Sequence, residues 1–87
     1  MLIKKEELSD FYDEIKKQGG EVDKEMRQIS FKISELATEH WVIKEGSGGF
    51  LDIVYERTSA WGGIAPQNST KECREKIEKA IERIRKK

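Results

Sequence analysis

The chain has 87 residues, of which 17 are Lys or Arg and 17 are Asp or Glu, so its formal net charge is zero. This length has room for one domain, residues 1–87, with a thin hydrophobic core. No apolar run is long enough to cross a membrane, no secretion signal is visible, and one cysteine excludes an internal disulfide. We therefore expect a soluble, cytoplasmic, single-domain protein.

The first segment of the chain predicts a helix over about residues 4–18. Its apolar residues recur at the spacing of one helical face, namely Leu8, Phe11, Tyr12 and Ile15. Lys16 and Lys17 suit the negative end of this helix, and Gly19 can adopt the left-handed conformation that closes it.

Three segments that follow alternate apolar and polar residues, which is typical of half-buried strands. They lie near residues 27–35, around Trp41 and Ile43, and from Leu51 to Tyr55. One apolar face forms only if the loop across Gly46–Gly49 has an odd length, so we expect a three-residue loop with a left-handed glycine. The residues expected to face the core are Ile29, Phe31, Ile33, Trp41, Ile43, Leu51, Ile53 and Tyr55.

The last segment, Ser69 to Lys87, predicts a second helix. Ser69 followed by Glu72 is a capping-box signature. Its apolar stripe consists of Cys73, Ile77, Ala80, Ile81 and Ile84. The predicted fold class is α+β, with a helix, a three-stranded antiparallel meander and a helix in that order. Because each helix has one apolar face, both should cover the same side of the sheet.

Three apolar residues remain on the other side of the predicted sheet: Val42, Phe50 and Val54. A solvated sheet face is normally polar at such positions. They are either scattered surface residues or a surface for a partner or a second copy, and a thin core makes a homo-oligomer a reasonable source of stability.

The connector between the last strand and the last helix, Arg57–Asn68, is long and uncharged after its first residue. Loops of this length are often functional, and the helix start that follows can bind an anion. The candidate ligand-binding residues are Arg57, Trp61, Gly62, Gly63, Ser69 and Thr70. The alternative is structural, with Trp61 and Ile64 closing the core.

Other reactive residues do not assemble into a recognisable catalytic motif. His40 stands beside Glu39 and near Glu35, in an expected turn, and one imidazole with two flexible acids does not make a metal or acid–base site. Cys73 lies in an apolar stripe, where a thiol packs as a small hydrophobic group. We therefore expect no enzyme activity, no metal and no cofactor.

Charge is distributed unevenly along the chain. Residues 69–87 carry eight basic and four acidic groups, a net +4, and residues 1–68 carry nine basic and thirteen acidic groups, a net −4. The order of predicted elements resembles that of double-stranded-RNA-binding domains, which hold phosphates with lysines at the start of their last helix. In the matching stretch, Ser69–Lys76, acids alternate with the bases.

These patterns favour a small non-catalytic binding protein, of a sequestering or inhibitory kind. The connector would take a small anionic or nucleotide-like ligand or a protein partner. One alternative is a nucleic-acid-binding module that uses the basic last helix. Another is a structural adaptor or oligomerisation domain that uses the outer sheet face.

Overall fold

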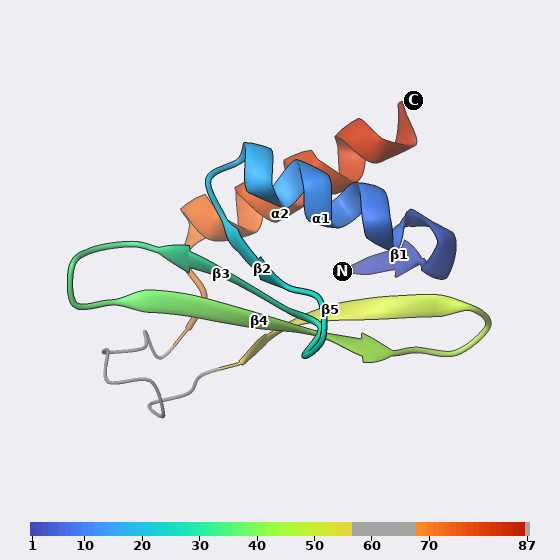
Figure 1. Ribbon diagram of the computed structural model, residues 1–87, viewed down its shortest axis with the longest axis horizontal. Coiled ribbons are helices and arrows are strands. Elements are labelled where there is room, and N and C mark those ends of the chain that lie inside the picture. Colours follow the sequence, from blue (N-terminus) through green and yellow to red (C-terminus); the bar gives the residue numbers. More distant parts are fainter. Residues whose placement is uncertain (57–67, 87) are drawn as a thin grey trace.

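The computed structural model describes residues 1–56 and 68–86. Its elements in chain order are β1 (Leu2–Lys4), the 3-10 helix η1 (Lys5–Glu7), α1 (Leu8–Lys17), β2 (Glu21–Asp23), β3 (Gln28–Lys32), β4 (Thr38–Glu45), β5 (Phe50–Glu56) and α2 (Lys71–Arg85). The five strands form one antiparallel sheet in the order β1-β5-β4-β3-β2 (Figure 1).

The α+β class is confirmed, but the predicted three-stranded meander is wrong, because β1 and β2 add a strand at each edge of the sheet. Both have only three residues and one inward side chain each, Ile3 in β1 and Val22 in β2. Such segments are too short to show a strand period. The first predicted helix is correspondingly shorter, since Leu2–Lys4 is a strand and the α-helix begins at Leu8.

The register of the β4–β5 hairpin agrees with the prediction. Trp41 pairs with Tyr55 and Ile43 pairs with Ile53, so these side chains share one face. The Gly46 N–H donates to the Phe50 carbonyl at 2.9 Å, which leaves a three-residue loop of Ser47, Gly48 and Gly49. Both loop glycines have a positive φ, 66° and 80°, a conformation that side chains disfavour.

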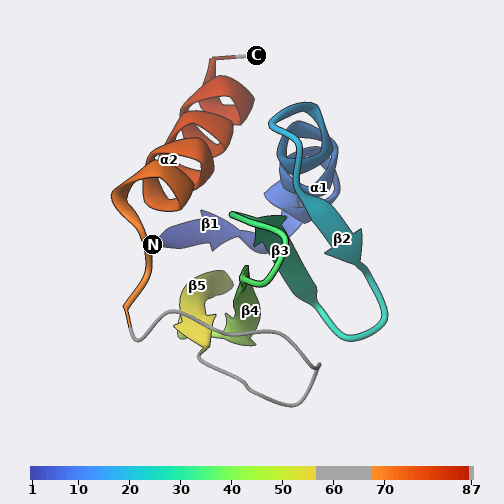
Figure 2. The same ribbon diagram turned by 90° about the vertical axis from the view of Figure 1, so that its left-hand side faces the viewer.

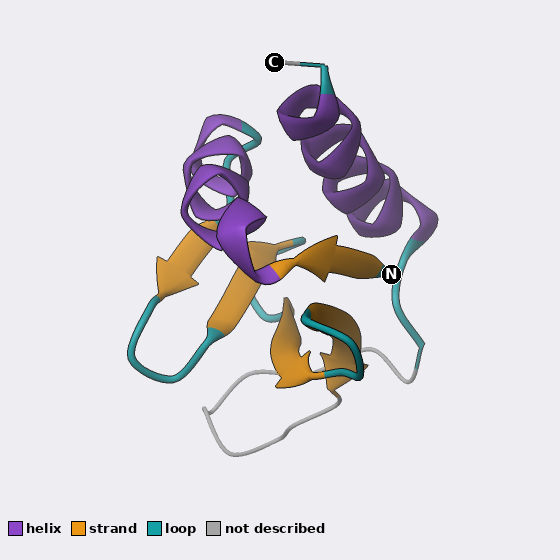
Figure 3. Cartoon of the chain, turned by 90° about the vertical axis from the view of Figure 1, so that its right-hand side faces the viewer, coloured by secondary structure: helices purple, strands orange, loops and turns teal. Residues whose placement is uncertain are grey.

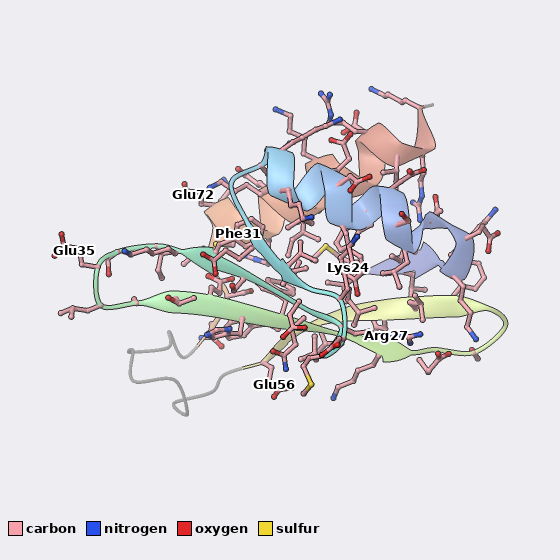
Figure 4. All side chains as sticks on the ribbon, viewed as in Figure 1. Lys24, Arg27, Phe31, Glu35, Glu56 and Glu72 are labelled. Carbon is pink, nitrogen blue, oxygen red and sulfur yellow. The ribbon has the colours of Figure 1, made fainter. Side chains whose placement is uncertain are left out.

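Both helices lie on the same face of the sheet, side by side (Figures 2 and 3). The core between helices and sheet contains the predicted stripe of α2 and the inward residues of β3, β4 and β5. Tyr55 is partly buried with its ring centroid 5.5 Å from that of Trp41, an edge-to-face contact. In Figure 4, Phe31 lies on the helix side of the sheet and Glu56 on the opposite side.

One residue assigned to the core is misplaced by the prediction. Ile33 is 37% exposed, because β3 ends at Lys32 and the chain turns there toward β4. The Ile33 N–H donates to the Ala37 carbonyl at 3.0 Å and closes this turn.

The two helices are also joined by a buried ion pair. The Glu14 side chain on α1 is 1% exposed and accepts a hydrogen bond from Arg83 Nε on α2 at 2.9 Å. Lys17 contributes a second contact at 3.4 Å. Neither helix, within the ranges 1–56 and 68–86, has the length and apolar character needed to span a membrane.

Candidate functional site

The predicted ligand-binding residues fall into two groups. Arg57, Trp61, Gly62 and Gly63 lie outside the described residues, and their assignment stays a prediction. Ser69 and Thr70 are described, immediately before α2.

The start of α2 is bound by a carboxylate of the protein itself. Glu39 on β4 has a side chain with 0% exposure. Its Oε2 atom accepts hydrogen bonds from the Thr70 N–H at 3.0 Å and from the Thr70 hydroxyl at 2.9 Å. Its Oε1 atom accepts one from the Trp41 indole N–H at 3.0 Å. The donors that the sequence offers to an external anion at Thr70 therefore already hold an internal one.

Thr70, rather than the predicted Ser69, is the capping residue of α2. Its hydroxyl oxygen accepts a hydrogen bond from the Cys73 N–H at 3.2 Å. This contact places the buried Cys73 thiol close to Glu39. Burial raises the pKa of that thiol. The hydrogen bond with Thr70 lowers this pKa, and the charge of Glu39 raises it further. Cys73 is thus held in its neutral thiol form, which is poorly nucleophilic.

The face of the sheet opposite the helices shows which predicted surface residues come together. Val42 and Val54 are direct cross-strand partners, both half-buried. Phe50 is the first residue of β5, two outward positions before Val54, and is 37% exposed. The pair formed by Lys44 and Asp52 separates it from the two valines. We call this surface the helix-free face, and it consists of the outward residues of the five strands.

A hollow of about 240 Å³ lies toward the β2 edge of the sheet. Its walls come from three strands and comprise Glu21, Val22, Asp23, Gln28, Ile29, Ser30 and His40. Gln28 also pairs with Val42, so the hollow and the valine pair are neighbours on the sheet. Two of the outward residues of this hollow, Glu21 and Asp23, carry carboxylates, which suit a basic group.

His40 lies in this hollow and pairs across the strands with Ser30 and Glu56. It is therefore a sheet residue and not part of a turn. In the two described stretches of the chain, no group of three or more His, Cys, Asp or Glu side chains is arranged to hold a metal ion.

The basic residues of α2 are largely engaged in ion pairs. Four of them contact carboxylates within 4 Å, namely Lys71, Lys76, Arg83 and Arg85, and so does Lys86, which follows the helix. Their partners lie on α2 itself, on α1 and on η1. A phosphate backbone would have to compete with these carboxylates, which disfavours the nucleic-acid alternative.

Two features of this site escaped the sequence analysis. Glu39 lies two residues before Trp41 and four before Ile43, so it points to the same inward face of β4. The alternation of the strand therefore predicts its inward position. Glu21 and Asp23 carried no comparable signal, because β2 has only three residues.

Comparison of the chain with models of protein families, with curated proteins and with solved structures returned no match.

Proposed function

We propose that the protein is a non-catalytic binding protein that takes a polypeptide ligand on the helix-free face of its sheet. The observation that supports this proposal is the pairing of Val42 with Val54 in the middle of that face. A solvated strand position is normally polar, whereas apolar groups at the centre of a surface are typical of faces that a partner covers.

The hollow beside the valine pair supports a polypeptide rather than a small molecule. Its volume of about 240 Å³ is below the roughly 300–1,000 Å³ of small-molecule sites. It is large enough for one side chain. Because Glu21 and Asp23 line it, a Lys or Arg side chain is the complementary group.

The start of α2 is less suited to an external ligand. An anion that used the two donors of Thr70 would have to displace the Glu39 carboxylate. That displacement would leave a buried charge with fewer hydrogen bonds, which is energetically unfavourable.

A random-peptide display library selected on the immobilised wild-type protein tests this function. The enriched peptides should bind the double variant Val42→Lys/Val54→Lys at least about tenfold more weakly, because a charge replaces apolar contact. Lys79→Glu is the matched control, since it changes an exposed charge on α2. Peptides that bind all three proteins equally, with unchanged circular dichroism, would contradict the proposed surface.

A further inference from the structure

We propose that the polypeptide on the helix-free face is a second copy of this chain. The two copies would be related by a two-fold axis that lies between their stacked sheets, runs parallel to β4 and β5, and passes over the line where these two strands meet. This inference rests on the proposed function, because it assigns the partner of the same surface. It goes further by fixing which residues face each other.

The outward residues of the hairpin formed by β4 and β5 lie in cross-strand pairs. Along β4 they are His40, Val42 and Lys44, with Gly46 directly after the strand, and along β5 the residues beside them are Glu56, Val54, Asp52 and Phe50. The four pairs are an imidazole with a carboxylate, two apolar groups, a cation with a carboxylate, and a large residue with a glycine. β4 and β5 are complementary to each other at four consecutive positions.

A two-fold axis parallel to the strands exchanges β4 with β5 and preserves the position along them. Every outward residue of β4 in one copy then faces a residue of β5 in the other copy, and the two residues that meet are those that pair side by side within one chain. Lys44 faces Asp52, Val42 faces Val54, and His40 faces Glu56. Two sheets stacked in this way keep their strands nearly aligned, as packed sheets commonly do.

The other in-plane two-fold axis, perpendicular to the strands, does not fit the charges. With this axis placed at the Val42–Val54 pair, Asp52 would lie over Glu56, which brings two carboxylates together across the interface. Like charges that face each other disfavour association, so the pattern selects the parallel axis.

Phe50 supports the same arrangement by its size. Its side chain is 37% exposed, and the residue across from it, directly after β4, is Gly46, which has no side chain. In the proposed dimer the ring of Phe50 enters the space above Gly46 of the other copy. Large groups that fill such gaps are typical of interface centres.

The charged positions are accessible to a partner. Lys44 is exposed, and the Asp52 side chain retains 44% exposure although one of its oxygens lies 3.2 Å from the terminal amino group. Each copy would thus contribute Lys44 to one intermolecular ion pair and Asp52 to another, which makes two pairs per dimer.

Sedimentation analysis of two charge-reversal variants tests the inference. Wild type should have twice the monomer mass of 10.1 kDa. Lys44→Glu and Asp52→Lys should each weaken self-association by at least about 100-fold, because each creates two repulsive contacts per dimer. An equimolar mixture of the two variants should recover the dimer, since both cross-interface contacts become attractive again.

The mixture isolates the intermolecular contact, because each variant still carries like charges side by side within its own chain. Lys79→Glu on α2 should retain the wild-type mass. Phe50→Asp provides a second test that leaves Asp52 and its amino-terminal contact intact, and it should also yield monomers.

A wild-type mass of 10.1 kDa at all concentrations would overturn the dimer, while selected peptides that still require Val42 and Val54 would leave the proposed function in place. Dimers that persist in both charge variants, or a mixture that stays monomeric, would overturn the proposed axis.

Discussion

At the scale of single residues, Glu39 shows how one polar side chain can organise a small core. It occupies a position where the alternation of β4 calls for an apolar group, and it is fully buried. Three hydrogen bonds from Trp41 and Thr70 satisfy its carboxylate. A buried carboxylate is tolerated only with such partners, so Glu39 fixes where the start of α2 meets the sheet.

Glu14 gives the protein a defined acid sensitivity. Burial alone would raise the pKa of this carboxyl, but the hydrogen bonds from Arg83 and Lys17 outweigh it and hold the pKa below its ordinary value of 4.5. The stabilisation is therefore fully present above pH 4.5 and is lost as the pH falls through the lower folded-state pKa. Glu14→Gln should lower the free energy of unfolding at pH 7 and flatten its decline below pH 4.5.

Urea unfolding of both proteins between neutral and acidic pH measures this effect. Asp13→Asn is the matched control, because it removes an exposed carboxylate from the same helix. An acid decline as steep in Glu14→Gln as in wild type would refute the role given to Glu14.

Tyr12 presents the opposite situation, a buried polar atom without a hydrogen bond. Its side chain is 4% exposed, and its hydroxyl has no partner among the residues that the structure describes. Burial raises the pKa of the phenol, against the influence of Arg27. Tyr12→Phe should keep or increase the free energy of unfolding, by about 0–2 kcal/mol, because it removes an unsatisfied group. A loss above about 1 kcal/mol in urea unfolding would reveal a partner for this hydroxyl.

At the scale of elements, the cap of α2 ties the helix to the sheet. Thr70→Val should lower the free energy of unfolding by about 1–3 kcal/mol, since it removes both the cap and one donor to Glu39. Thr70→Ser keeps the hydroxyl and should retain most of the stability. Ser69→Ala should have little effect, and chemical denaturation of the three variants checks this order. A larger loss in Ser69→Ala than in Thr70→Val would restore Ser69 as the cap.

The elements also show what the sequence could and could not reveal. The period of α2 and the alternation in β4 and β5 specify which faces are buried, and parity alone determines the three-residue loop between these strands. β1 carries no such information, because it has three residues and pairs with a strand about fifty residues away. Its position depends on the sheet edge left open by β5, which is a property of the assembled fold.

For the candidate site, the limit of prediction is different. The outward positions of Val42 and Val54 follow from strand parity, and the structure adds that the two residues are direct partners. The charges of α2 looked available in the sequence, yet many of them pair with acids on α1, η1 and α2 itself. Pairing between distant elements cannot be deduced from local patterns. The basic helix therefore gives weaker support for a proposed function than the sheet face does.

At the scale of the whole molecule, the proposed dimer links stability to concentration. A domain of 87 residues buries a limited core, so in the proposed dimer a covered helix-free face would add a substantial share of its stability. Unfolding of a dimer releases two chains, and mass action then raises the melting temperature with concentration. Each tenfold increase should raise it by roughly 3–6 °C, as expected for a domain of this size. Val54→Lys should melt at a lower temperature that does not change with concentration, whereas Lys79→Glu should behave as wild type. Scanning calorimetry over a hundredfold concentration range measures this directly.

A wild-type melting temperature that stays constant over that range would mean that folding does not depend on a second copy, and that this sheet face is stable on its own in water.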